Sequence, residues 1–202
     1  ELIYYLSEAA AYGRDILYDQ NGKWNLAIRR TLEAIYQNYT GDRESQDFKN
    51  FEVYLKRVWF SNGIHHHYGC DKFVPEFSQE FFTEAVKSLD PKTLPLTTGA
   101  SVDDLLNTLT PVIFDSSVMP KRVNQAAGED LIVTSAGNYY DGVTQAEAEA
   151  FYNKMKNPKD ETPISYGLNS RLVKRDGKIV EETYKVGGLY TEAIEKIVYW
   201  LE

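Results

Sequence analysis

Three consecutive histidines and the only cysteine of the chain lie within one short stretch, VWFSNGIHHHYGC, at residues 58–70. The 202 residues contain no other histidine. Imidazole and thiolate groups are common zinc ligands, and a cysteine beside a histidine can also form a reactive thiolate pair. The stretch therefore poses a choice between a metal site, a nucleophilic centre and a piece of binding surface.

A zinc site at these histidines would need more ligands than the sequence clearly offers. If residues 65–67 were extended, His65 and His67 would share one face, because side chains alternate along a strand. Cys70 or Asp71 could supply a third ligand, yet the spacing matches no established zinc pattern and HExxH-type motifs are absent. We predict no metal ligand in this chain, and a metal-dependent hydrolase that uses His65–His67 stays as an alternative.

Other catalytic centres find less support. Cys70 lies three to five residues from the histidines, and side chains so close in sequence seldom converge on a nucleophile–base geometry. Adjacent acids such as Asp103 and Asp104 are explained more simply as a helix start or a solvated surface. The stretch GNYYDG lacks the lysine of a phosphate-binding loop. We therefore predict no catalytic residue in the chain.

Charge and composition exclude two classes of partner. The formal net charge is −8, and no basic stripe interleaves with aromatic residues, so we predict no nucleic-acid partner. No apolar run approaches the ~20 residues that span a membrane, so we predict no membrane partner. The 15 tyrosines, 9 phenylalanines and 3 tryptophans indicate a core of large amphipathic side chains, or a cleft lined with rings for peptide or sugar.

Hydrophobic periodicity and capping residues predict a helix-rich chain. Ser78 and Ser101 are expected helix N-caps, and Thr144 with Glu147 forms an expected capping box. Residues 130–135 are predicted to form a strand and residues 137–144 a loop. The expected helices are residues 2–12, 24–39, 46–58, 79–89 and 145–155, a short one after Ser101, and a final one after Gly188.

A β-hairpin is predicted near the C-terminal end. Two extended runs flank Asp176-Gly177, the dipeptide that two-residue type I′ turns prefer. The predicted fold class is α+β, helix-rich, with a small antiparallel sheet or partial barrel that includes this hairpin. Both ends of the chain lie in helical patterns without a cap or a Gly/Pro stop, so we expect an excised piece of a longer protein.

Several stretches together resemble one family. SEAAAYGRDILYDQNGKWNLAIRRTLEAIY, FEVYLKRVWFSNGIHHHYGCDKFVPEFSQEFF and ISYGLNSRLVKRDGKIVEETYKVGGLY look like the N-terminal part of dipeptidyl peptidase III, the M49 zinc metallopeptidase family, in its Bacteroides-type members. The resemblance covers essentially the whole chain. Its most specific element is WFSNG followed shortly by KFVP.

The resemblance implies a protein of two lobes, of which only one holds the catalytic zinc. Members of the family release dipeptides from the N-termini of oligopeptides, and their zinc is held in one lobe by an HExxGH-like helix and a glutamate of an EExRxD-like motif. This chain contains neither motif. The resemblance therefore implies that this fragment has no cofactor and that the parent enzyme binds zinc. Residues 1–202 are expected to be a single domain, the N-terminal part (lower lobe) of a longer two-lobed peptidase.

The expected function is a non-catalytic lobe that provides scaffold and one wall of the substrate cleft, in a cytoplasmic enzyme. The expected partners are an oligopeptide substrate and the catalytic zinc-binding lobe of the same chain. A stand-alone peptide- or protein-binding module is the alternative, beside the metal-dependent hydrolase. The candidate cleft residues are Asn62, His65, His66, His67, Tyr68, Tyr139 and Tyr140.

Overall fold

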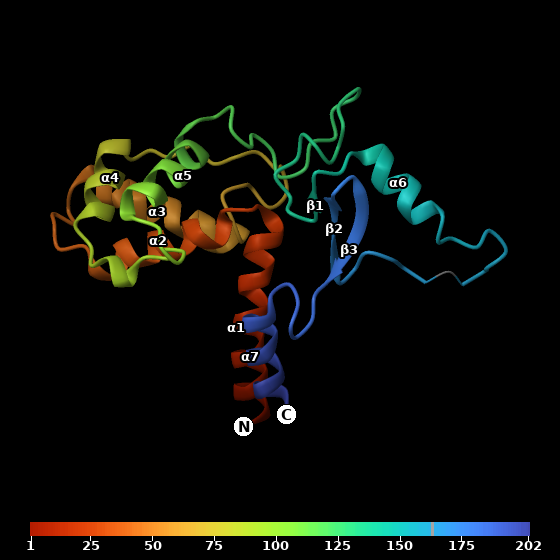
Figure 1. Cartoon of the computed structure of the whole chain (residues 1–202). Coiled ribbons are helices and arrows are strands. Elements are labelled where there is room, and N and C mark those ends of the chain that lie inside the picture. The colour runs from red at the N-terminus through yellow and green to blue at the C-terminus, as the bar shows by residue number, and fades with distance from the viewer. Residues whose placement is uncertain (163) are drawn as a thin grey trace. The chain divides into compact units, whose positions relative to one another are not determined.

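The computed structural model describes residues 1–162 and 164–202 (Figure 1). The described residues form seven α-helices, one short 3₁₀ helix and three strands, which confirms the predicted α+β class. In chain order the elements are α1 (Leu2–Asn21), α2 (Asn25–Asn38), α3 (Gln46–Ser61), α4 (Gln79–Lys87), η1 (Pro91–Thr93), α5 (Val102–Phe114), β1 (Tyr140–Asp141), α6 (Gln145–Asn153), β2 (Ser170–Arg175), β3 (Lys178–Thr183) and α7 (Thr191–Leu201).

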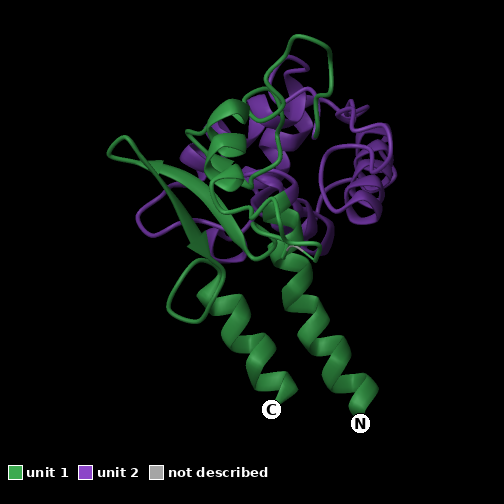
Figure 2. Cartoon of the chain, turned by 90° about the vertical axis from the view of Figure 1, so that its right-hand side faces the viewer, with its two compact units in different colours: residues 1–20, 123–202 green, residues 21–122 purple. Residues whose placement is uncertain are grey.

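The expected single domain over residues 1–202 is built as two compact units (Figure 2). Unit 1 comprises Glu1–Gln20 and Val123–Glu202, and unit 2 comprises Asn21–Arg122. Unit 1 thus joins the first helix to the last eighty residues, and it contains the sheet. No described helix is long and apolar enough to cross a membrane.

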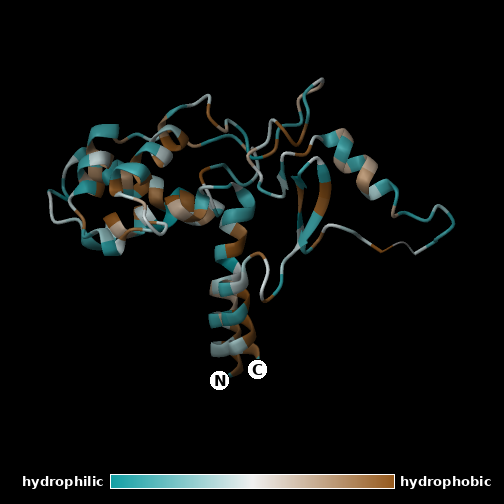
Figure 3. Ribbon diagram, viewed as in Figure 1, coloured by the Kyte–Doolittle hydropathy of each residue, from teal (hydrophilic) through white to brown (hydrophobic). Residues whose placement is uncertain are grey.

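Unit 2 is a helical unit whose core follows from apolar residues at helical spacing. Ile28, Leu32 and Ile35 of α2 are fully buried, and they recur at spacings of four and three residues. Figure 3 shows that the helices of unit 2, α2 to α5, carry both hydrophobic and hydrophilic residues. Rings fill much of the remaining core, with Phe51 and Phe77 in an edge-to-face contact at 5.7 Å between ring centroids.

Helix starts are where the sequence predictions are confirmed most closely. The Ser78 side chain accepts a hydrogen bond from the Phe81 N–H at the start of α4. Ser101 begins α5 in the same way, in a reciprocal capping box that the sequence did not specify. The Thr144–Glu147 capping box at the start of α6 is present as predicted. Such caps satisfy backbone N–H groups that the first helical turn leaves without partners.

The sheet of unit 1 has the strand order β1-β2-β3. The β2–β3 hairpin is confirmed, and Asp176 and Gly177 have φ values of 50° and 75°, as a type I′ turn requires. The sheet is mixed rather than antiparallel, because β1 pairs parallel to β2. Its three described strands form an open sheet and do not close into a barrel.

Helix α6 covers one face of this sheet. Leu172 of β2 is 1% exposed and packs with Val143 and Ala148, which lie just before and within α6. At the edge of this contact the Lys174 ammonium pairs with the Glu147 carboxylate at 2.5 Å. The packing fixes the C-terminal end of α6 above the start of β2.

Three element predictions were wrong. Residues 130–135 form turns instead of a strand, because the Asp130 carboxylate accepts the N–H groups of Ile132 and Val133 at 2.9 and 3.0 Å. Short polar side chains that bond nearby N–H groups compete with regular strands in this way. The loop predicted at 137–144 contains β1, and the first helix continues from residue 12 to Asn21.

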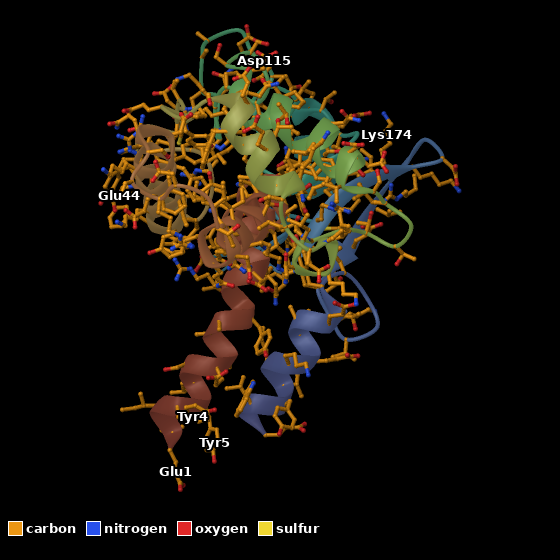
Figure 4. The ribbon with its side chains drawn as sticks, turned by 90° about the vertical axis from the view of Figure 1, so that its left-hand side faces the viewer. Glu1, Tyr4, Tyr5, Glu44, Asp115 and Lys174 are labelled. Carbon is orange, nitrogen blue, oxygen red and sulfur yellow. The ribbon has the colours of Figure 1, made fainter. Side chains whose placement is uncertain are left out.

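Helices α1 and α7 run antiparallel and side by side, with both termini at the same end (Figures 1 and 2). Tyr4 and Tyr5 project from the N-terminal end of α1 (Figure 4). Their ring centroids lie 5.5 and 6.1 Å from the Trp200 ring of α7. The aromatic contact joins the free ends of the two helices.

The other end of α1 is held by a polar network around Asp19. The Asp19 carboxylate accepts hydrogen bonds from the Tyr190 hydroxyl at 2.5 Å and the Asn138 side-chain amide at 3.0 Å. The Asn138 backbone N–H also donates to the Gln20 carbonyl at 2.8 Å. These bonds tie α1 to the start of β1 and to the turn before α7.

We predict that Asp19→Ala destabilises the chain by about 2–3 kcal/mol, because two donors of a partly buried network lose a charged acceptor. Urea unfolding followed by circular dichroism measures the change. Glu8→Ala, which removes another acid of the same helix, is the control and is expected to cost under about 0.5 kcal/mol. Equal effects of the two substitutions would contradict this role for Asp19.

Candidate functional site

The histidine-containing stretch begins where α3 ends. Asn62 ends the helix in the left-handed conformation at φ 52°, a position that asparagine tolerates well. Gly63 follows at φ 146°, and the Asn25 side chain occupies the space that a Cβ would need. Asn62 and Gly63 therefore form the turn that ends α3.

The next residues, 65–72, form the histidine turn. The His66 N–H donates to the Asp71 carbonyl at 2.8 Å, and the Cys70 N–H donates to the His66 carbonyl at 2.9 Å. An isolated bridge pairs His65 with Lys72. These bonds fold the three histidines into a tight reversal, so they do not lie on one face of a strand.

The histidine turn is clasped to residues 118–122, which follow α5. The Lys72 N–H donates to the Pro120 carbonyl at 3.0 Å, and the Arg122 N–H donates to the Cys70 carbonyl at 2.8 Å. Asp71 and Lys121 form an ion pair at 2.8 Å. The Lys72 ammonium donates to the carbonyls of residues 112, 115 and 118 at the C-terminal end of α5, where the helix dipole favours a cation.

His65 is part of this clasp and is only 2% exposed. His65, a candidate cleft residue, is therefore buried and does not present its side chain at the surface. Its Nε2–H donates to the Met119 carbonyl at 2.8 Å. Burial is the main cause that lowers its pKa, and the nearby charges of Lys72 and Arg122 lower it further.

His66, His67 and Tyr68 lie closer to the surface. The Nδ1 atom of His66 accepts the N–H groups of Tyr68 and Gly69 at 3.2 and 3.1 Å. The half-buried His67 ring packs against Tyr68 at 4.3 Å and against Phe60 at 4.9 Å, measured between ring centroids. Tyr68 is 84% exposed, so this cluster of rings faces solvent.

The hydrogen bonds of the histidine turn engage some of its imidazole nitrogens. One ring nitrogen of His65 and one of His66 are already engaged, with the Met119 carbonyl and with two backbone N–H groups. Across residues 1–162 and 164–202, no three side chains of His, Cys, Asp or Glu are grouped as metal ligands.

We predict that the chain loses stability as the pH falls from 7.5 to 5.5. The folded-state pKa of His65 lies below its unfolded value of about 6.5, so the unfolded chain takes up the proton first and is favoured as the pH drops through that value. The urea midpoint at each pH measures the loss. His65→Gln should reduce the loss and His66→Gln should keep it, while an identical pH dependence in all three proteins would contradict the prediction.

A second candidate site lies in unit 1, where a hollow of about 720 Å³ opens beside β1. We call it the tyrosine groove, because four tyrosines contribute to its walls. Its volume falls within the range of small-ligand sites, which are typically concave and lined with rings and a few polar groups. The lining residues are Tyr139, Tyr140, Tyr152, Lys156, Asn157, Pro158, Asp160, Ile164, Ser165, Tyr166, Gly167 and Ser170.

Strand β1 supplies one wall of the groove and a free backbone edge. The Leu172 N–H donates to the Tyr139 carbonyl at 3.0 Å, which sets the phase of the parallel ladder. In such a ladder, alternate residues of a strand direct their backbone groups toward the neighbouring strand. The N–H and C=O of Tyr140 therefore point away from β2.

The opposite wall comes from the end of α6 and the segment before β2. Gly167 has φ +76°, and a Cβ there would lie 2.8 Å from the Tyr152 hydroxyl. Only glycine lets the backbone approach the Tyr152 ring this closely. The Tyr166 hydroxyl donates to the Met155 carbonyl at 3.2 Å, which holds the second ring in place.

Two residues that line the groove donate hydrogen bonds to Glu181, an exposed residue of β3. The Ser170 hydroxyl and the Tyr152 hydroxyl both donate to Oε1 of Glu181, at 2.5 and 3.3 Å. Burial first, and then the Glu181 charge, raises the pKa of Tyr152 to about 12. Tyr152 therefore stays protonated at neutral pH and remains a donor to Glu181.

The predicted site residues fall into two groups in different units. Asn62, His65, His66, His67 and Tyr68 belong to the end of α3 and the histidine turn of unit 2. Tyr139 and Tyr140 line the tyrosine groove of unit 1. The sequence reasoning missed Tyr152, Tyr166 and Glu181, because only packing of α6 on the sheet brings them to Tyr140.

Comparisons with known proteins give no assignment for either site. No family model matches the chain, and no curated protein matches it.

Proposed function

We propose that this chain is a non-catalytic lobe of a zinc-dependent dipeptidyl peptidase, which releases dipeptides from the N-termini of oligopeptides. In this proposal the chain provides scaffold and one wall of the substrate cleft. The observation that carries the peptide-holding role is the tyrosine groove beside the free edge of β1.

The groove suits an extended peptide for two reasons. Its rings offer large, rigid contact area that costs little conformational entropy to order. The outward N–H and C=O of Tyr140 can pair with a peptide backbone, as in strand addition to a sheet edge. Backbone pairing holds peptides of varied sequence, which an enzyme that acts on many oligopeptides requires.

A partner lobe has a surface to pack on in this proposal. The free ends of α1 and α7 expose a group of large apolar side chains, and contiguous apolar surface of this kind marks interaction sites. The group comprises Leu2 (70% exposed), Ile3 (81%), Leu6 (49%), Tyr199 (69%) and Leu201 (60%). We assign this surface to the catalytic zinc-binding lobe of the same polypeptide.

The chemical step belongs to that other lobe in our proposal. The residues of this chain would bind and orient the peptide, and none of those described would transfer a proton or hold the metal. A stand-alone peptide-binding module would use the same groove, and it would need no partner on α1 and α7. A hydrolase built on His65–His67 is less favoured, because the His65 side chain is buried.

We predict that an oligopeptide of five residues binds the tyrosine groove of the purified chain with a Kd below about 1 mM. Nuclear magnetic resonance titration of the isotope-labelled chain measures both the affinity and the residues that respond. Tyr152→Ala should weaken binding about fivefold or more, because it removes a ring from the wall.

Tyr68→Ala is the matched control, since it removes an exposed ring from the histidine turn and should leave the affinity unchanged. Binding that avoids the groove would count against the proposed peptide wall. Release of dipeptides by the purified chain in the presence of zinc would contradict the non-catalytic assignment.

A further inference from the structure

His65 is a buried titratable side chain, and one of its ring nitrogens has no partner. Its Nε2–H donates to the Met119 carbonyl at 2.8 Å, and the residue is 2% exposed. Nδ1 is shielded from solvent, and no atom of the described residues forms a hydrogen bond with it. Protonation of His65 places a charged N–H at Nδ1 without an acceptor, and a buried charge without a partner is costly. The clasp between the histidine turn and residues 118–122 therefore requires the neutral imidazole.

The charges around His65 oppose a further positive charge. The cations that act on it are Lys72 of the histidine turn and Arg122 of the opposite segment. Asp71 is the acid that acts on His65, and its carboxylate is already paired with Lys121 at 2.8 Å. Burial is the main cause that holds the pKa of His65 below its ordinary value, and the two cations lower it further.

Both halves of the clasp contain a strained backbone position. Cys70 in the histidine turn and Met119 in the opposite segment have φ values of 61° and 50°. This left-handed region is uncommon for residues other than glycine, and it persists where surrounding contacts impose it. Those contacts include the bond from the Arg122 N–H to the Cys70 carbonyl and the bond from His65 to the Met119 carbonyl. Loss of these bonds lets both positions relax, so the strain favours opening of the clasp.

The clasp also fastens the segment by which the chain leaves unit 2. Helix α5 ends at Phe114, and residues 115–122 that follow it contain no further helix or named strand. Arg122 is the last residue of unit 2, and Val123 begins the second part of unit 1. Opening of the clasp therefore frees the connection from α5 to unit 1.

We propose that the clasp is an acid-released latch, in which proton uptake by His65 opens residues 65–72 and 118–122 while the helical core of unit 2 stays folded. Protonation of buried histidines drives switches of this kind in proteins that respond to mildly acidic pH. The latch uses no residue of the tyrosine groove, so it does not depend on the proposed function.

Amide hydrogen exchange, followed by nuclear magnetic resonance on the whole chain, tests the latch. The N–H groups of Lys72 and Arg122 bond across the clasp to the carbonyls of Pro120 and Cys70, and we call them the latch amides. After correction for the intrinsic exchange rate at each pH, their exchange should rise about fivefold to tenfold between pH 7.5 and 5.5. An imidazole with an ordinary pKa of about 6.5 that is protonated mainly in the open state gives a rise of this size.

Urea separates opening of the latch from unfolding of the unit. At pH 5.5 the latch amides should exchange faster than the amides of Leu32 and Ile35 in the core of α2. About 1 M urea should accelerate the α2 amides, which exchange through global unfolding, and leave the latch amides unchanged, because local opening exposes little surface.

His65→Gln should remove the pH dependence of the latch amides, because glutamine can donate to the Met119 carbonyl and does not titrate. His66→Gln is the matched control and should keep it, since the buried imidazole remains. The unmodified chain provides an independent check. The ring signals of His65, one of only three histidines, should titrate with the same midpoint as the exchange of the latch amides.

Three results would overturn the proposal. Exchange of the latch amides that stays constant between pH 7.5 and 5.5 would exclude an acid-released latch. Latch amides that match the α2 amides in rate and in urea dependence would show that acid lowers the stability of the whole unit instead. A pH dependence that survives His65→Gln, or a His65 midpoint that differs from that of the latch amides, would show that His65 is not the trigger.

Discussion

The arrangement of unit 1 depends on the hydrogen bonds that converge on Asp19. This carboxylate joins residues that are 119 and 171 positions away in the sequence, Asn138 and Tyr190. A partly buried carboxylate needs such donors, because leaving it without them would cost several kcal/mol. Once Asn138 is held, Tyr139 and Tyr140 follow directly as the wall of the groove. The Arg171 guanidinium also donates to the Asn138 side-chain oxygen at 3.4 Å, which brings β2 into the same network.

The histidine turn shows how a chemically suggestive motif can serve structure. His65 is buried against Met119, the His66 ring accepts two N–H groups of its own turn, and His67 packs among exposed rings. Lys72 acts in the same region as an internal cap, since its ammonium satisfies carbonyls at the end of α5. These roles occupy one ring nitrogen of His65 and one of His66.

Strand β1 is an edge strand that borders the groove. Alternate residues of an edge strand direct their N–H and C=O groups away from the sheet, and in β1 Tyr140 is that residue. Helix α6 covers the same face only as far as Tyr152, and the sheet beyond it is left to the segment around Gly167. Glu181 of β3 accepts hydrogen bonds from Tyr152 and Ser170, which line the groove.

Structural features that depend on residues close together in the sequence could be predicted from the sequence. The capping box of Thr144 with Glu147 and the turn at Asp176-Gly177 involve residues within three positions of each other, so their geometry needs no distant partner. The strand predicted at residues 130–135 does not form, and the reason is also local. The Asp130 carboxylate accepts a backbone N–H group that a strand would have used for pairing.

Long-range placement was decided by the tertiary structure alone. Whether His65 would be buried and Tyr68 exposed depended on the clasp to residues 118–122, which lie about fifty positions away. The meeting of Tyr140, Tyr152 and Glu181 depended on packing α6 against a sheet whose first strand runs parallel to the second. By itself the sequence determined the helix-rich α+β class, the main helix starts and the hairpin, because these follow from hydrogen bonds between near neighbours. The groove and its carboxylate arise from side chains far apart in the chain, and only the packed fold brings them together.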